Sequence, residues 1–173
     1  MDDTTDRETN PFGRVVGPWE QVIDDMHATA EGYREEGLTV IECHPGDVAT
    51  LTGEPRTAAE LTGQDDPDAP DRRLGLDVVV PGNEFDDARS ALTGPDPTYV
   101  DVFQATGNGM VFLLFGLQWS DIVLLVPAYY DQSDEKALRD VTRESGLSVY
   151  VRPLADDERV VFTLDDPEPC FPE

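Results

Sequence analysis

The stretch that decides the fold is MVFLLFGLQWSDIVLLVPAYY, residues 110–130. It carries one charge, Asp121, and is long enough to span a bilayer. However, the polar run 118–121 would then lie near the bilayer midplane, where a single aspartate costs about 2.5–3.5 kcal/mol. No Lys or Arg flanks the stretch closely. It therefore predicts two buried strands, 110–117 and 122–126, joined by a polar turn, and no membrane partner.

Strand and helix signals continue on both sides of this pair. The turn Thr106-Gly-Asn-Gly109 predicts a hairpin that joins a strand over 99–105 to the first buried strand. Further strands are predicted at 74–80, 147–154 and 159–164, and helices at 83–92 and 134–145. Residues 74–164 thus follow a strand–helix–strand–strand order twice. Duplication of one unit and a chance recurrence of elements both explain this order.

The N-terminal part predicts a helix that begins at Pro18 and ends near Gly37. Its apolar residues fall at helical spacing on one face: Trp19, Val22, Ile23, Met26, Ala30 and Tyr33. A strand over 38–43 follows, with 48–51 as its hairpin partner across Pro45-Gly46.

We expect an α+β fold: a mainly antiparallel sheet with about three helices on one face. The predicted organisation is a flexible acidic tail over 1–16, one domain over 17–166 and an extended Pro-rich tail over 167–173.

Charge is the dominant feature of the composition. The 173 residues include 37 Asp and Glu against 12 Lys and Arg, a net charge of −25, and Lys136 is the only lysine. Such a surface is typical of proteins adapted to molar salt, where a Debye length of about 3 Å screens self-repulsion. The alternative is an acidic protein of ordinary salt that binds basic partners. Either way, the lack of a basic patch beyond Arg72-Arg73 makes nucleic acid an unlikely partner.

The two cysteines, Cys43 and Cys170, lie far apart in a chain without an export signal at Met1–Thr4. This pattern predicts reduced thiols and a cytoplasmic location.

The sequence resembles a family of uncharacterised small acidic proteins of haloarchaea. Five motifs carry the resemblance: Trp19-Glu-Gln-Val22, His44-Pro-Gly-Asp47, Val126-Pro-Ala-Tyr-Tyr130, Tyr150-Val-Arg-Pro-Leu154 and Pro167-Glu-Pro169. The resemblance implies a domain of unknown function from a halophilic organism, and it supplies no catalytic residues. Were the duplication real, the fold would be similar to the ligand-binding domains of some multidrug-responsive regulators.

Glu42, His44 and Asp47 are the candidate catalytic residues. They follow a predicted strand, and a histidine beside carboxylates can perform acid–base chemistry. The alternative is a purely structural turn, since Pro45-Gly46 dictates one. Cys43 is a poor nucleophile candidate, because adjacent strand residues point to opposite faces and separate it from His44.

No metal site and no cofactor are predicted. His27, Cys43, His44 and Cys170 are the soft ligands, and no pair has the close spacing of a structural zinc site. Calcium-loop and phosphate-binding glycine motifs are also missing from the sequence.

Trp119, Tyr129, Tyr130 and Asp131 are the candidate ligand-binding residues. They flank the most apolar strand, and aromatic rings with a carboxylate can hold a cationic or planar ligand. Core packing is the alternative explanation.

The sequence therefore favours a non-catalytic module that binds a small molecule or a protein. A small enzyme that uses Glu42, His44 and Asp47 at a strand-end cleft is the second hypothesis. Nothing in the sequence indicates the oligomeric state.

Overall fold

A computed structural model describes residues 13–52, 74–143, 145–154 and 158–172. Within them the strands form two sheets, β1-β6-β5-β4 and β2-β3-β7-β8. The helices and strands are α2 (Gly13–Glu35), β1 (Thr39–Glu42), β2 (Asp47–Thr52), β3 (Leu74–Val79), α3 (Gly82–Leu92), β4 (Tyr99–Gly107), β5 (Met110–Gln118), β6 (Ile122–Asp131), α4 (Glu135–Thr142), β7 (Leu147–Arg152) and β8 (Val160–Leu164). Two 3₁₀ turns, η2 (Gln132–Asp134) and η3 (Glu168–Cys170), complete the order.

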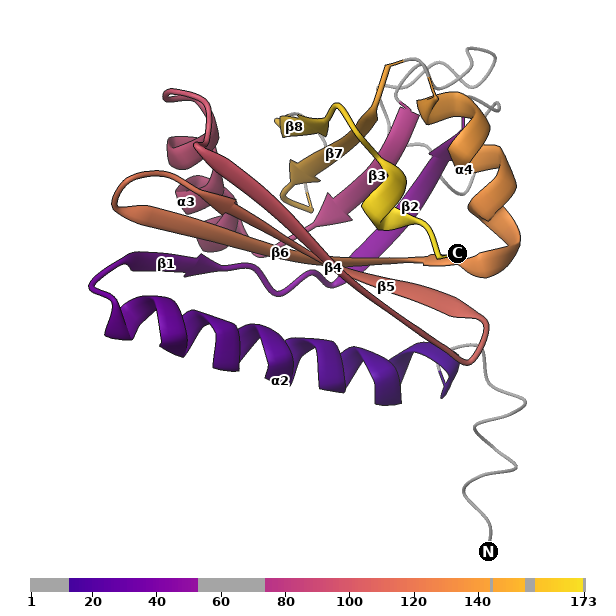
Figure 1. Ribbon diagram of the computed structural model, residues 1–173, viewed down its shortest axis with the longest axis horizontal. Coiled ribbons are helices and arrows are strands. Elements are labelled where there is room, and N and C mark those ends of the chain that lie inside the picture. The colour runs from indigo at the N-terminus through magenta and orange to yellow at the C-terminus, as the bar shows by residue number, and fades with distance from the viewer. Residues whose placement is uncertain (1–12, 53–73, 144, 155–157, 173) are drawn as a thin grey trace, which may run out of the picture.

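The central strands β5 and β6 are covered on both faces, as their uninterrupted apolar sequence predicted. Alternate residues of β5 and β6 enter the core between the two sheets, where Phe115 meets Phe162 of β8 edge-on at 5.5 Å. The intervening residues, among them Leu114 and Leu125, pack against Met26 of α2. Figure 1 shows this layering, with α2 along one side of the first sheet and the second sheet on the other.

The predicted α+β class is confirmed, but the predicted single sheet is wrong. Most strand pairs are antiparallel, whereas β1 pairs with β6 and β3 with β7 in parallel, so both sheets are mixed. The helices also do not share one face. Helix α2 covers the outer face of the first sheet, α3 contacts strands of both sheets, and α4 packs on β2 and β3. Sequence periodicity reports which face of a strand is buried, and it does not report which strand lies beside it.

The hairpin predicted across Pro45-Gly46 is also wrong, because its two strands do not pair with each other. Strand β1 belongs to the first sheet and β2 to the second, where β2 pairs with β3. The Pro-Gly segment therefore carries the chain from one sheet to the other.

Helix α2 begins at Gly13, so Pro18 lies inside it rather than at its start. The run Thr57-Ala-Ala-Glu60, whose spacing fits a capping box and predicts one helical turn, lies outside the described residues, and the domain boundaries stay a prediction.

The order strand–helix–strand–strand does occur twice, as β3-α3-β4-β5 and β6-α4-β7-β8. A two-fold relation between the units would require the parallel pairing of β3 with β7 to be matched by a pairing of β6 with β4. Instead β6 pairs with β5, and antiparallel. The units therefore share an order of elements and not an arrangement, which removes the ground for comparing the fold with duplicated regulator domains.

The C-terminal segment is attached to the body through Cys170 and Phe171. Both are buried, and the hydroxyl of Tyr130 donates a hydrogen bond of 2.8 Å to the Cys170 carbonyl. The guanidinium of Arg139 lies 4.5 Å from the centre of the Phe171 ring. The segment contains the turn η3 and is not fully extended.

The parallel pairing of β3 with β7 depends on Gly75. Its φ is +134°, and a β-carbon there would overlap the carbonyl oxygen of Ser148 on β7. We expect Gly75→Ala to lower the free energy of unfolding by about 3 kcal/mol, from backbone strain and overpacking together. Gly82→Ala is the matched control, since its β-carbon would meet nothing within 4 Å. Equal melting temperatures of the two variants, followed by circular dichroism, would contradict this role.

Candidate metal centre

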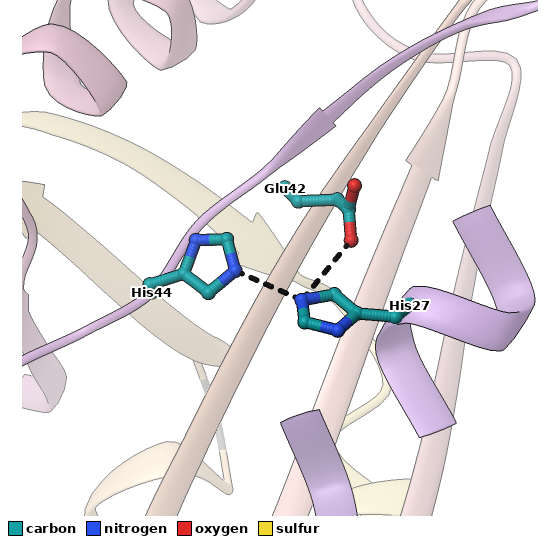
Figure 2. Close-up of side chains that lie close together, drawn as sticks. All are labelled: His27, Glu42 and His44. Carbon is teal, nitrogen blue, oxygen red and sulfur yellow. Dashed lines mark hydrogen bonds and ion pairs between the residues drawn. The ribbon is translucent and has the colours of Figure 1, made fainter. Parts of the chain in front are cut away.

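Strand β1 sends its side chains alternately to the core and to α2. Ile41 and Cys43 face the core between the sheets, and Cys43 is fully buried there. Glu42 lies on the opposite face and reaches α2, and His44 follows it on the same side. Figure 2 shows His27 of α2 meeting both of these side chains.

The three side chains converge through atoms that can bind a metal ion. The Nε2 atoms of His27 and His44 are 3.1 Å apart, and Nε2 of His27 lies 3.6 Å from Oε1 of Glu42. All three donor atoms lie within 4.8 Å of one another. A tetrahedral site with metal–nitrogen bonds of 2.0–2.1 Å has ligand atoms about 3.3 Å apart. The two separations measured from Nε2 of His27 bracket this value, and both imidazoles are half-exposed, which leaves them room to turn toward a shared ion.

Glu84, in the first turn of α3, fixes the orientation of His44. One carboxylate oxygen accepts the backbone N–H of His44 at 2.6 Å, and the other lies 2.7 Å from Nδ1. A carboxylate partner favours the proton on Nδ1, so that Nε2 of His44 accepts the 3.1 Å hydrogen bond from Nε2 of His27. A metal at the cluster would bind this Nε2 lone pair in place of that hydrogen bond. Carboxylate–histidine–metal arrangements of this kind recur in zinc sites.

Glu42 is held from its other side by Arg34. The guanidinium donates to Oε2 of Glu42 at 2.7 Å and to Glu31 at 3.0 Å, and these hydrogen bonds raise the pKa of Arg34. Oε1 of Glu42 is shielded from solvent and, within the described part of the chain, accepts no hydrogen bond. A desolvated carboxylate oxygen without a partner costs roughly 1–3 kcal/mol. It faces His27, where a bound cation would offset this cost.

The cluster opens onto a groove of about 540 Å³ between β1 and α3. Glu42, Glu84 and Asp87 contribute negative charge to its lining, and Arg34 contributes positive charge. Apolar side chains, among them Ile41 and Ile122, form part of the wall. The arrangement can hold a cation with room for further ligands on the groove side.

The structure brings together two of the three candidate catalytic residues. Glu42 and His44 belong to the cluster, whereas Asp47 begins β2 opposite Val79. The charge of Asp47 contributes to raising the pKa of the Tyr129 hydroxyl, after the larger effect of burial. Sequence reasoning missed Glu84 as the partner of His44. An acid in the first turn of the following helix was the available signal, but only the fold shows which histidine it meets.

The four aromatic and acidic candidates do not form one pocket. Trp119 precedes β6 and donates its indole N–H to the Pro95 carbonyl at 2.7 Å. At the other end of β6, Tyr129 packs edge-on against Trp19 at 5.3 Å, while the buried Tyr130 faces the opposite side of the sheet. Asp131 accepts the backbone N–H of Ser133 and caps η2. These roles match the core-packing alternative.

Both cysteines are predicted to be unreactive in the folded protein. Burial raises the pKa of the Cys43 and Cys170 thiols to about 12, so the thiolate population at pH 8 is on the order of 10⁻⁴. We expect a disulfide reagent at pH 8 to leave both unmodified until denaturant is added. Rapid modification of Cys43 in the native state would restore it as a nucleophile candidate.

Comparison with known proteins places the chain in a family. No helix in the described ranges is long and apolar enough to cross a membrane. Neither the curated proteins nor the solved structures include a significant match. One family model, the family of unknown function DUF7529, matches residues 5–172. Since this match spans nearly the whole sequence, the chain belongs to the DUF7529 family.

Proposed function

We propose that the protein is a non-catalytic binding module whose ligand is a divalent transition-metal ion, held by His27, Glu42 and His44. The observation that carries the proposal is the convergence of two imidazole nitrogens and one desolvated carboxylate oxygen within 4.8 Å. No metal site is predicted from the sequence, because the ligands lack close spacing along the chain. The proposal departs from that expectation because the fold supplies the proximity.

The donor set favours a particular class of metal. Two imidazoles and one carboxylate suit zinc and other first-row ions, whereas calcium and magnesium prefer oxygen ligands alone. Three protein ligands leave at least one coordination position for water or an exchangeable molecule on the groove side. The small-molecule binding role expected from the sequence thus acquires a defined chemistry.

The enzyme hypothesis receives less support. It requires Glu42, His44 and Asp47 to act together, but the carboxylate beside His44 belongs to Glu84. Glu84 is bonded to both the backbone and the ring of His44, which favours a positioning role over proton transfer to a substrate. Metal binding is therefore the function that we propose.

Metal titration tests the proposal. The protein should bind Co²⁺ with the visible absorption of a low-symmetry site, and Zn²⁺ should displace it. His44→Ala should weaken Zn²⁺ binding more than about 100-fold, since it removes a ligand, and Glu84→Gln roughly 10–100-fold, since it removes an outer partner. Isothermal titration calorimetry in molar KCl with excess Mg²⁺ would measure the Zn²⁺ affinity of the wild type and of both variants.

A matched control separates coordination from general acidity. Asp24→Asn removes one negative charge from an exposed position of α2, as Glu42→Gln does within the cluster. We expect only Glu42→Gln to weaken binding. If Asp24→Asn weakens it equally, or if His44→Ala leaves it unchanged, the ion is held by diffuse charge and the proposed site is wrong.

We also propose that the protein is cytoplasmic, of haloarchaeal origin and adapted to molar salt. The support is the net charge of −25, the single lysine and the resemblance carried by the motifs quoted above. At low ionic strength the Debye length grows from about 3 to 10 Å, and the surplus carboxylates repel one another across the surface.

Lowering KCl from molar concentration to about 0.1 M should therefore reduce the melting temperature or unfold the domain. Circular dichroism at a series of KCl concentrations would measure the effect. Tetramethylammonium chloride at equal ionic strength is the control. If charge screening alone stabilises the fold, it should raise the melting temperature as much as KCl does. An unchanged melting temperature between brine and dilute buffer would contradict salt adaptation.

A further inference from the structure

Strand β4 forms an edge of the first sheet. It lies at the end of the order β1-β6-β5-β4 and pairs one-to-one with β5 from Tyr99 to Gly107, with no bulge. Proteins usually protect such edges with short strands, bulges, proline or lysine. The turn η3 lies beside one end of this edge, where Gln104 donates hydrogen bonds to the carbonyls of Pro169 and Phe171. The rest of the nine-residue edge contains none of these devices. Its exposure in a stable protein therefore suggests that it has a partner.

The side chains of β4 leave a partly apolar opening with a single charge in an acidic surface. Asp101 is its only charged residue. Tyr99, Val100 and Phe103 are 62%, 42% and 52% exposed, which makes them three of the five large hydrophobic residues recorded as exposed in the described structure. Two copies of a chain with a charge of −25 repel each other over most of their surface. Contact through this opening would avoid that repulsion.

The turn beside β4 determines which backbone groups point outward. Asn108 and Gly109 both have positive φ, 55° and 79°, the conformation of a type I′ two-residue hairpin. Gly107 and Met110 then form a hydrogen-bonded pair, and such pairs alternate along the ladder. It follows that the N–H and C=O groups of residues 100, 102, 104 and 106 point away from β5, toward solvent.

These outward groups can pair with the same groups of a second copy. In the antiparallel register with its two-fold axis at Phe103, residue 102 lies opposite 104 and residue 100 opposite 106. Phe103 then faces its own copy, and Asp101 faces the small Ala105. Moving the axis to Asp101 would instead place two carboxylates opposite each other, which is destabilising. The register centred on Phe103 avoids this juxtaposition, so the strand can pair with its own copy without facing carboxylates.

We propose that β4 is a homodimer interface, in which two copies join edge to edge and their first sheets become one continuous sheet. The contact is isologous, as expected for a closed two-fold dimer. On the α2 side, the Phe103 rings meet beside a groove of about 190 Å³ whose lining includes Val22, Thr29, Phe112 and the acidic Asp25. This register places the Tyr99 ring of each copy beside Gly107 of the other, where it would meet the ring of Pro18 on α2.

The oligomeric state in molar KCl tests the proposal on the full-length protein. Sedimentation equilibrium should detect a dimer of the wild type. Phe103→Glu places two carboxylates on the axis and should raise the dimer dissociation constant roughly 100-fold or more. Leu154→Glu is the matched control, since it adds the same charge at an 83% exposed leucine away from β4, and it should leave dimerisation unchanged.

Monomeric wild type at all accessible concentrations would overturn the proposal. So would a Phe103→Glu variant that dimerises as well as Leu154→Glu does. Phe103 is half-exposed, so the variant should keep the wild-type circular dichroism spectrum, which separates lost contact from lost folding.

Oxidative cross-linking tests the register independently. The Phe103 pair is of the non-hydrogen-bonded type, with α-carbons about 4.5 Å apart, which suits a disulfide. Phe103→Cys should give a covalent dimer, whereas Asp101→Cys should not, because its copies would lie about 13 Å apart. Cys43 and Cys170 are buried and should not interfere. Faster cross-linking through position 101 would overturn the register and with it the proposed interface.

Discussion

Burial on both faces of β5 and β6 is the constraint on which the rest of the structure depends. A strand pair that is apolar between its ends cannot leave either face in water, so each face requires its own cover. Helix α2 covers one face and the second sheet covers the other. The chain must therefore build two layers around a single strand pair. The remaining strands and helices occupy the positions that this requirement leaves open.

The same constraint orients the candidate metal centre. Strand β1 pairs with β6 in register, Val40 beside Val123 and Glu42 beside Leu125. Both Val123 and Leu125 face α2, so Glu42 faces α2 as well. The helix presents Arg34 and His27 to it. A polar site thus forms at the margin of an apolar interface, where Glu42 is desolvated on one side and the histidines remain half-exposed.

Local sequence patterns predicted the elements that depend on local causes. The 110–130 stretch gave both central strands, Thr106-Gly-Asn-Gly109 gave the β4–β5 hairpin, and the apolar spacing from Trp19 to Tyr33 gave the buried face of α2. The pairing of strands distant in sequence was not predictable, because any apolar strand fits beside β6. The turn at Pro45-Gly46 illustrates this limit. Its chemistry specifies a reversal of direction, but not that the chain changes sheets.

The candidate site escaped prediction for the same reason. Glu42 and His44 were recognised from their place at the end of a strand. His27 lies seventeen residues before His44, on a helix, and Glu84 lies forty residues after it. Their proximity arises from the packing of α2 on β1 and from the position of α3. Spacing along the chain identifies zinc sites built on one hairpin or one helix. It carries no signal for ligands that separate elements bring together.

The proposed salt adaptation and the proposed metal site constrain each other. In molar salt a screening length of about 3 Å removes long-range steering, so the acidic surface cannot concentrate a scarce divalent ion at the groove. A site made of carboxylates alone would also be exposed to the abundant hard cations of a brine. Imidazole nitrogens bind such ions poorly and bind first-row transition metals well. Under these conditions selectivity must come from direct coordination, and the two histidines of this chain lie 3.1 Å apart beside the Glu42 carboxylate.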